Sequence, residues 1–161
     1  MTIDTSFPTR SHEENWLPVL ELSVEEVFEI MLGSRIKPAP RGERPVNCEF
    51  TAMVGLAGSL CGIISFSCAR ETARQVATCM IGPEIADSPQ QVSDALGEIC
   101  NMIAGNFKNK LAGTDGSCML SVPTVIEGGE YSFRSLAEGQ SFETTLAFND
   151  SLIVVNLQLH A

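Results

Sequence analysis

The sequence has few of the residues on which common enzyme sites depend. Its two histidines, His12 and His160, lie near the two ends of the 161-residue chain, so its middle offers no imidazole as a general base or metal ligand. The six cysteines occur singly without a CxxC pair, which favours reduced core residues over a disulfide framework or a zinc site. A GxSxG motif and a phosphate-binding glycine loop are also missing. The common hydrolase sites are therefore not supported.

Positive charge is scarce as well. Ten Lys and Arg residues stand against 20 Asp and Glu residues, which gives a formal net charge of -10. Nucleic-acid-binding proteins gain much of their affinity from clustered Lys and Arg, so we expect no nucleic-acid partner. The sequence has no apolar run of membrane-spanning length and no signal peptide at its start, so we also expect no membrane association and a cytoplasmic location.

The composition, 44% hydrophobic and 19% charged, is that of a globular protein. We expect a polar N-terminal lead-in over residues 1–20 and one folded domain over residues 21–161. The predicted strands are grouped in hairpins and the predicted helices are about three. The expected fold is therefore α/β of the α+β type, with a largely antiparallel sheet and the helices packed on it.

Local signals place the elements. A capping box of Ser23 and Glu26 predicts a helix that begins at residue 23 and ends at Gly33. Further helices are predicted over 69–82 and 88–110, the latter with Ser88 as cap in a capping box and Pro89 at its first position. The basic, proline-rich segment 35–45 predicts a loop. Strand-like patterns cover 47–56, 60–67, 117–129, 131–136, 141–148 and 152–159.

The predicted helix 88–110 carries the most informative pattern. At about 100° per residue, Asp94, Glu98 and Asn101 share a stripe about 60° wide. Gly105 falls on the same stripe, and Lys108 lies close to it near the end of the helix. The apolar residues centre on the opposite side: Val92, Leu96, Ile99, Ile103 and Phe107. We therefore expect the stripe to face outward.

A solvated helix face is the first interpretation of this stripe, because every amphipathic helix has a polar side. Two features favour a contact site instead. Asp94 and Glu98 are like charges four residues apart, which destabilises a helix, and Asn101 has poor helix propensity. Gly97 and Gly105 each cost about 1 kcal/mol relative to alanine. Close approach of another surface would explain such glycines.

Three segments of the sequence resemble a known family. The stretch "DALGEICN" (94–101) matches the pattern (Asp or Ser)-xxx-Glu-xx-Asn of the CheC/CheX/FliY phosphatases of bacterial chemotaxis. The stretch "VEEVFEIMLG" (24–33) resembles the first helix of CheX-type proteins. The stretch "LSVPTVIEGGEY" (120–131) resembles the strand and proline-containing segment that follow their motif helix. The resemblance covers roughly residues 20–159 and is strongest to the CheX type.

The resemblance implies a phosphatase that removes the aspartyl phosphate of a response-regulator receiver domain, typically CheY-like, in chemotaxis or two-component signalling. Under this hypothesis Asn101 orients the attacking water and Glu98 binds the lysine of the receiver's active site. Asp94, Gly105 and Lys108 are candidate partner contacts. No cofactor is expected on this chain, and Mg²⁺ is expected in the receiver.

The resemblance also implies a homodimer formed through the sheets, with residues 141–148 and 152–159 as candidate edges. CheC-type relatives carry two motifs, but here Glu29 is followed three residues later by Leu32 instead of Asn, so we expect one site. A non-catalytic CheX-like module that binds a receiver or another partner remains an alternative. An enzyme for small phosphate esters is less favoured, because only Lys108 accompanies the stripe. The basic segment 35–45 is a candidate patch for attracting the receiver.

Overall fold

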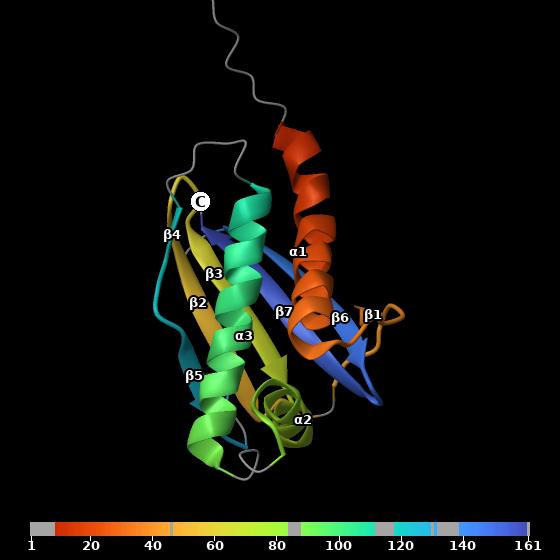
Figure 1. Cartoon of the computed structure of the whole chain (residues 1–161). Coiled ribbons are helices and arrows are strands. Elements are labelled where there is room, and N and C mark those ends of the chain that lie inside the picture. The colour runs from red at the N-terminus through yellow and green to blue at the C-terminus, as the bar shows by residue number, and fades with distance from the viewer. Residues whose placement is uncertain are drawn as a thin grey trace, which may run out of the picture.

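The helices and strands lie in one sheet with helices on one face (Figure 1). The computed structural model describes residues 9–45, 47–83, 88–111, 118–129, 131 and 139–160, with side chains from Trp16 onward. The elements are, in chain order, α1 (Thr9–Leu32), β1 (Lys37–Pro38), β2 (Phe50–Gly58), β3 (Gly62–Cys68), α2 (Arg70–Ile81), α3 (Pro89–Lys110), β4 (Cys118–Leu120), β5 (Thr124–Glu127), β6 (Gly139–Phe148) and β7 (Ser151–His160).

The sheet has the order β1-β6-β7-β3-β2-β4, and β5 also pairs with β2. Every pairing among the described strands is antiparallel. The helices α1 and α3 run side by side in opposite directions across one face, and α2 lies near one end of that face (Figure 1). The expected α+β architecture, with an antiparallel sheet and three helices in the described part of the chain, is confirmed.

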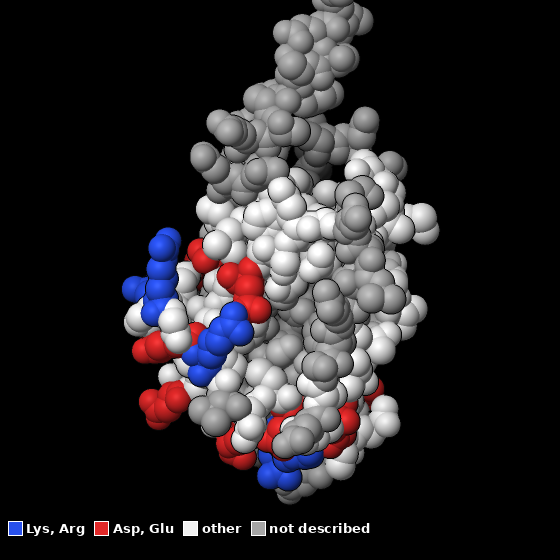
Figure 2. Space-filling model, turned by 180° about the vertical axis from the view of Figure 1, so that it is seen from behind, with Lys and Arg blue, Asp and Glu red and all other residues white. Residues whose placement is uncertain are grey.

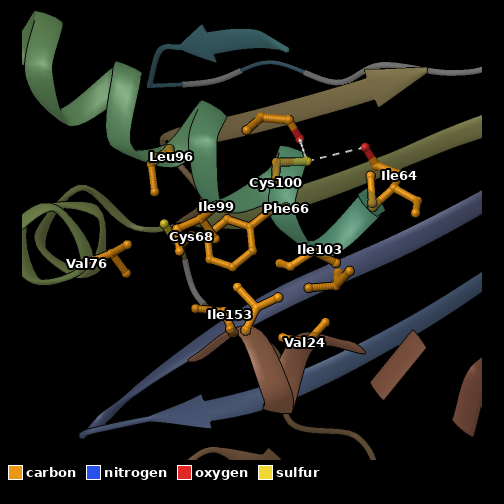
Figure 3. Close-up of a cluster of buried hydrophobic side chains, with 14 of the residues drawn as sticks. Val24, Ile64, Phe66, Cys68, Val76, Leu96, Ile99, Cys100, Ile103 and Ile153 are labelled. Carbon is orange, nitrogen blue, oxygen red and sulfur yellow. Dashed lines mark hydrogen bonds between the residues drawn. The ribbon is translucent and has the colours of Figure 1, made fainter. Parts of the chain in front are cut away.

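The core fills the space between the sheet and the helices (Figure 3). Strand side chains that point toward the helices are fully buried, whereas their neighbours on the opposite face are mostly half-buried or exposed, as the alternation of a strand requires. Phe28 from α1 packs against Phe66 and Phe148, with ring centroids 6.1 and 5.4 Å apart. These aromatic contacts fix α1 on the sheet.

The first helix is longer than predicted. It begins at Thr9, so Ser23 lies in its interior, and the predicted helix start at Ser23 is wrong. The Ser23 hydroxyl donates to the Val19 carbonyl, 2.7 Å away, instead of capping a helix end. Leu20 is fully buried, and the ring of Trp16 lies 5.9 Å from that of Phe107. This packing overrides the capping signal and extends the helix across the boundary expected between residues 20 and 21.

Most other helices and strands agree with those predicted from the sequence. The hairpin of β2 and β3 and the helices α2 and α3 are confirmed within one or two residues at most termini. Ser88 is the N-cap of α3, but its side chain makes no capping bond, so the predicted capping box is wrong. The segment 117–129 contains two strands, β4 and β5, separated by residues 121–123. The strand predicted over 131–136 lies almost wholly outside the described residues.

The position of β7 corrects one expectation. It pairs with β6 on one side and with β3 on the other, so it is a central strand and offers no exposed edge. The other side of β6 pairs with β1 only at Leu146 and Ala147.

Within the described ranges, no helix has both the length and the apolar character needed to cross a membrane.

Candidate functional site

The polar stripe of α3 faces away from the core. Asp94 and Glu98 are exposed, and Asn101, Gly105 and Lys108 are half-buried. The apolar residues predicted on the opposite side are all buried: Val92, Leu96, Ile99, Ile103 and Phe107. The predicted orientation of α3 is therefore confirmed, and its acid and amide side chains are accessible along one face.

Within the stripe, the spacing of Glu98 and Asn101 brings two complementary groups together. Residues three apart on a helix have Cβ atoms about 5–6 Å apart, so both side chains can contact one small group. The carboxylate of Glu98 accepts hydrogen bonds, and the carboxamide of Asn101 both accepts and donates them. One turn earlier, Asp94 accepts a hydrogen bond from the Gln90 amide at 3.1 Å. This contact orders the Asp94 carboxylate beside Glu98.

A buried thiol holds the middle of α3 against the sheet (Figure 3). The Cys100 sulfur lies 3.5 Å from the Ala52 carbonyl oxygen of β2 and 3.6 Å from the Ile64 carbonyl oxygen of β3, and it donates toward both. Burial raises the pKa of this thiol to about 12, so it keeps its proton. Because Cys100 directly precedes Asn101, these contacts fix the helix backbone next to the amide.

A polar cluster joins the second half of α3 to α1. The Asn106 amide donates to the Ser23 carbonyl at 3.2 Å and to the Glu26 carboxylate at 2.9 Å. The Lys110 ammonium lies 2.7 Å from the same carboxylate. Hydrogen bonds from Lys110 and then Asn106 lower the pKa of Glu26. The stripe is therefore presented by a helix that is tied to both the sheet and α1.

The glycines on and beside the stripe differ in their surroundings. A Cβ atom at Gly97 would lie 3.4 Å from Pro123 Cβ and 3.5 Å from Val125 Cγ2. The close approach expected at this glycine is therefore made by the chain's own segment before β5. At Gly105 the nearest atom, Leu120 Cδ1, is 4.0 Å away, so side-chain packing leaves room there. Gly105 remains a candidate partner contact, whereas Gly97 is explained by packing.

Sequence reasoning missed the segment 121–123 as part of this region. Ser121 binds the backbone of Gly55 twice: its N–H donates to the Gly55 carbonyl at 2.9 Å, and its hydroxyl accepts from the Gly55 N–H at 2.8 Å. Pro123 then lies against Gly97 of α3. The sequence signal that could have revealed this contact is the pairing of a helix glycine with a proline segment that follows the same helix.

The basic segment 35–45 lies away from the stripe. It is beside β1, with α1 between it and α3 (Figure 1). Arg35 lies 3.6 Å from Glu29, and Arg44 lies 2.8 Å from Glu143. These cations are paired with the chain's own carboxylates, which weakens the hypothesis that they attract a partner to α3.

In the described ranges, no three His, Cys, Asp or Glu side chains are grouped as a metal site would require.

The fold and the stripe together define a class: an α+β domain whose antiparallel sheet carries a helix with an outward carboxylate and carboxamide three residues apart. The sequence profile described as "Chemotaxis phosphatase CheX" matches residues 50–147, which include β2 through most of β6. The chain belongs to this family. The matched residues contain the whole polar stripe of α3.

Known relatives agree with this assignment. The "CheY-P phosphatase CheX" of Thermotoga maritima is 27% identical over 117 residues, which cover 70% of this chain and 76% of that protein. The crystal structure of chemotaxis protein CheX from Desulfovibrio desulfuricans has a TM-score of 0.79 at 23% identity, covering 91% of this chain and 99% of the other. CheX in the CheX-CheY-BeF3-Mg complex of Borrelia burgdorferi has a TM-score of 0.72 at 24% identity. The match covers 91% of this chain and 98% of that chain.

Proposed function

We propose that this chain hydrolyses the aspartyl phosphate of a CheY-like receiver domain, with Glu98 and Asn101 of α3 as the site. The observation that carries the proposal is the pair of an exposed carboxylate and a half-buried, outward-facing amide, three residues apart on the helix that the family profile covers. The Thermotoga maritima relative is a CheY-P phosphatase by name, and the Borrelia burgdorferi relative forms a complex with CheY. Both names support a phosphorylated receiver as the substrate.

The chemistry needs positioning more than strong base catalysis. A water oxygen forms a bond to phosphorus while the bond from phosphorus to the aspartyl oxygen breaks, which gives phosphate and a free carboxylate. One proton of the water stays on the new phosphate oxygen, and the other is released to the solvent. The Asn101 amide oxygen accepts a hydrogen bond from this water and aligns it for in-line attack. A neutral amide does this without titrating near neutral pH.

Glu98 has a different role in the proposal. Its carboxylate accepts a charge-assisted hydrogen bond from the receiver's active-site lysine, which places Asn101 over the phosphoryl group. The exposure of Glu98 and its place one turn before Asn101 suit this contact. Asp94, Gly105 and Lys108 extend the contact along α3: Asp94 beside Glu98, Gly105 where the receiver backbone can approach, and Lys108 at the helix end.

Mg²⁺ belongs to the receiver in this proposal, and the residues of this chain act on the water and the receiver lysine. A cytoplasmic location follows from the receiver partner, which is phosphorylated there. An alternative of the same fold is a module that binds a receiver without hydrolysis. The retained pair of Glu98 and Asn101 favours the enzyme, because a binder has no need of an amide at the position that orients water.

The test is phosphate release from a panel of receiver domains of the same genome, each phosphorylated with acetyl phosphate and Mg²⁺. We expect the wild type to accelerate release from one receiver. Asn101→Ala should lower kcat about 100-fold or more with little change in KM, because it removes the group that aligns the water. Glu98→Ala should mainly raise KM, because it removes a ground-state contact to the receiver.

Matched controls are available outside α3. Asn47→Ala removes another exposed amide and Glu71→Ala another exposed carboxylate, and both should leave kcat and KM unchanged. A wild-type protein that binds a receiver but never shortens the lifetime of its phosphate would show that the chain is a non-catalytic binder. Full activity of Asn101→Ala would show that the water is oriented by another group.

We also propose that two copies of the chain associate through the free side of β6. Across residues 141–144, no described strand pairs with that side of β6, and an unpaired strand edge can accept another strand. Sedimentation equilibrium over a range of concentrations should give twice the monomer mass. Glu143→Pro, within the stretch of β6 that pairs with no described strand on this side, removes a backbone donor and should weaken the association.

A further inference from the structure

Two of the most exposed large apolar side chains that the structure describes lie on either side of the polar stripe. Val122 is 83% exposed and Ile30 is 77% exposed, although α3 between them shows mainly polar groups to solvent. A single exposed aliphatic residue needs no explanation. Two of them border the same site, and each is held there by specific contacts.

Val122 is held from both sides by its neighbours. Ser121 is bound to Gly55 through its N–H and its hydroxyl, and Pro123 packs against Gly97 of α3. The residue between them therefore has little backbone freedom, yet its side chain remains in solvent. Gly97 directly precedes Glu98, so Val122 is presented at the border of the stripe. An immobilised apolar side chain loses little entropy when a partner covers it.

Ile30 takes the corresponding place on α1. Asn106 of α3 contacts Glu26 of α1, and the two helices run in opposite directions (Figure 1). One turn from Glu26 toward the end of α1 is Ile30, and one turn from Asn106 toward the start of α3 is Met102. Both turns span about 6 Å, so Ile30 lies at the level of Met102, next to Asn101. It borders the stripe on the side opposite Val122.

We propose that Val122 and Ile30 are apolar contacts for the phosphorylated receiver, which packs on both while Glu98 and Asn101 reach its active site. This inference rests on the function proposed above. A specific protein interface buries about 800 Å² on each partner, and three side chains on one helix are too few to supply this area. The contact must therefore extend beyond α3, and among the described residues the 121–123 segment and α1 flank the stripe.

Charge does not supply the missing affinity. The chain carries a net charge of -10, and the cations of segment 35–45 lie beyond α1 and are partly paired. Apolar contacts around a polar centre can hold the receiver with little help from salt-sensitive attraction, and they exclude water from the hydrogen bonds at the stripe. The two residues would thus set affinity for the receiver while leaving the chemical step to Asn101.

Two other exposed apolar residues provide matched controls. Met119 is 75% exposed in β4, where its neighbours Cys118 and Leu120 pack on the core, so strand alternation directs Met119 to the opposite face of the sheet. That face is shown in Figure 2, where the charged residues gather on the left side and at the lower end of the molecule. Ile81, 41% exposed, is the last residue of α2. Neither control borders the stripe.

The experiment measures KM and kcat for phosphate release from the receiver selected by the panel, and the Kd of the same receiver loaded with BeF3 and Mg²⁺. Val122→Asp and Ile30→Asp should each raise KM and Kd about tenfold or more with kcat unchanged. Met119→Asp and Ile81→Asp should change neither. Thermal unfolding checks that each variant is folded, and Val122→Ala provides a milder change with an expected increase of a few-fold in KM.

The two proposals fail in different ways. If the wild type is active and Asn101→Ala is inactive, but Val122→Asp and Ile30→Asp keep the wild-type KM and Kd, the apolar contacts are refuted and the phosphatase stands. Equal increases in KM for the flanking variants and for Met119→Asp would also refute them, because the effect would then be one of charge. A wild type that accelerates hydrolysis of no receiver overturns both proposals.

Discussion

The helices α1 and α3 share one face of the sheet, and each carries an exposed glutamate, but only α3 has an asparagine three residues after it. Glu29 and Leu32 of α1 occupy the positions that Glu98 and Asn101 occupy in α3. Leu32 packs against the core at the end of α1, whereas Asn101 lies on the outward stripe. An exposed glutamate on a helix thus forms a candidate site only where the residue three positions later is polar and faces outward.

The two helices are also held differently. In α3, the Cys100 thiol donates toward backbone carbonyls of β2 and β3. Gly97 has no side chain, so the α3 backbone lies close to Pro123 there. α1 is held by large aromatic and aliphatic contacts and contains Pro18, which costs a helix about 3 kcal/mol or more and must be offset by that packing. The helix with the stripe is therefore the one that lies directly against the backbone of β2 and β3 through its thiol.

The largest expected effect comes from making α1 resemble α3. Leu32→Asn places an amide three residues after Glu29, and we expect it to lower the free energy of unfolding by about 2–3 kcal/mol, because it replaces an apolar core contact with a polar group. Urea unfolding measures this loss. The exposed control Glu29→Gln should stay within about 0.5 kcal/mol of the wild type.

The same variant tests whether α1 can become a second site. In the Asn101→Ala background, Leu32→Asn should restore no phosphate release, because the position at residue 32 faces the core. Recovery of activity in this double variant, measured at saturating receiver, would show that the two helices are interchangeable and that the comparison is wrong.

The next effect concerns the contact of α3 with the chain before β5. Gly97→Val should destabilise the protein by about 1–3 kcal/mol, because a branched side chain would overlap Pro123 and Val125. Gly105→Ala is the matched control with open space, and it should stabilise the protein by up to about 1 kcal/mol. Urea unfolding of both compares the two glycines directly. Equal effects would mean that Pro123 does not restrict α3.

The thiol contact of α3 should have a smaller effect. We expect Cys100→Ala to cost about 1–2 kcal/mol through the lost sulfur packing and hydrogen bonds, whereas Cys79→Ala at an exposed site should change little. In the folded protein at pH 8, iodoacetamide should label Cys79 and leave Cys100 unmodified, because burial raises the Cys100 pKa to about 12. Labelling of Cys100 at the rate of Cys79 would contradict its anchoring role.

The smallest expected effect lies at the junction of the two helices. Glu26→Gln should lower stability by about 0.5 kcal/mol at pH 7, because the ion pair with Lys110 is partly exposed. The pKa of Glu26 is lower in the folded state than its ordinary value of 4.5, so the contribution is present above 4.5 and is lost as pH falls through the folded value. Urea unfolding at pH 7 and pH 3 should show a smaller difference between wild type and variant at pH 3.

Much of the site was predictable because helix periodicity is a local property. The apolar set from Val92 to Phe107 determines which way α3 turns, and the outward stripe follows without knowledge of the sheet. The turn between β2 and β3 is likewise set by adjacent residues. The start of α1 was not predictable in this way, because the capping signal at Ser23 competes with the burial of Leu20 and Trp16 against distant parts of the chain.

The sequence by itself determined the α+β class, the amphipathic α3 and the pairing of carboxylate and amide on its outer face, since each depends on residues close together in the chain. Only the tertiary structure decided that β7 is central, that Gly97 accommodates Pro123, and that Val122 and Ile30 border the stripe. These features depend on which segments meet across the sheet and between α1 and α3. Such contacts arise from packing of the whole domain, which no local pattern records.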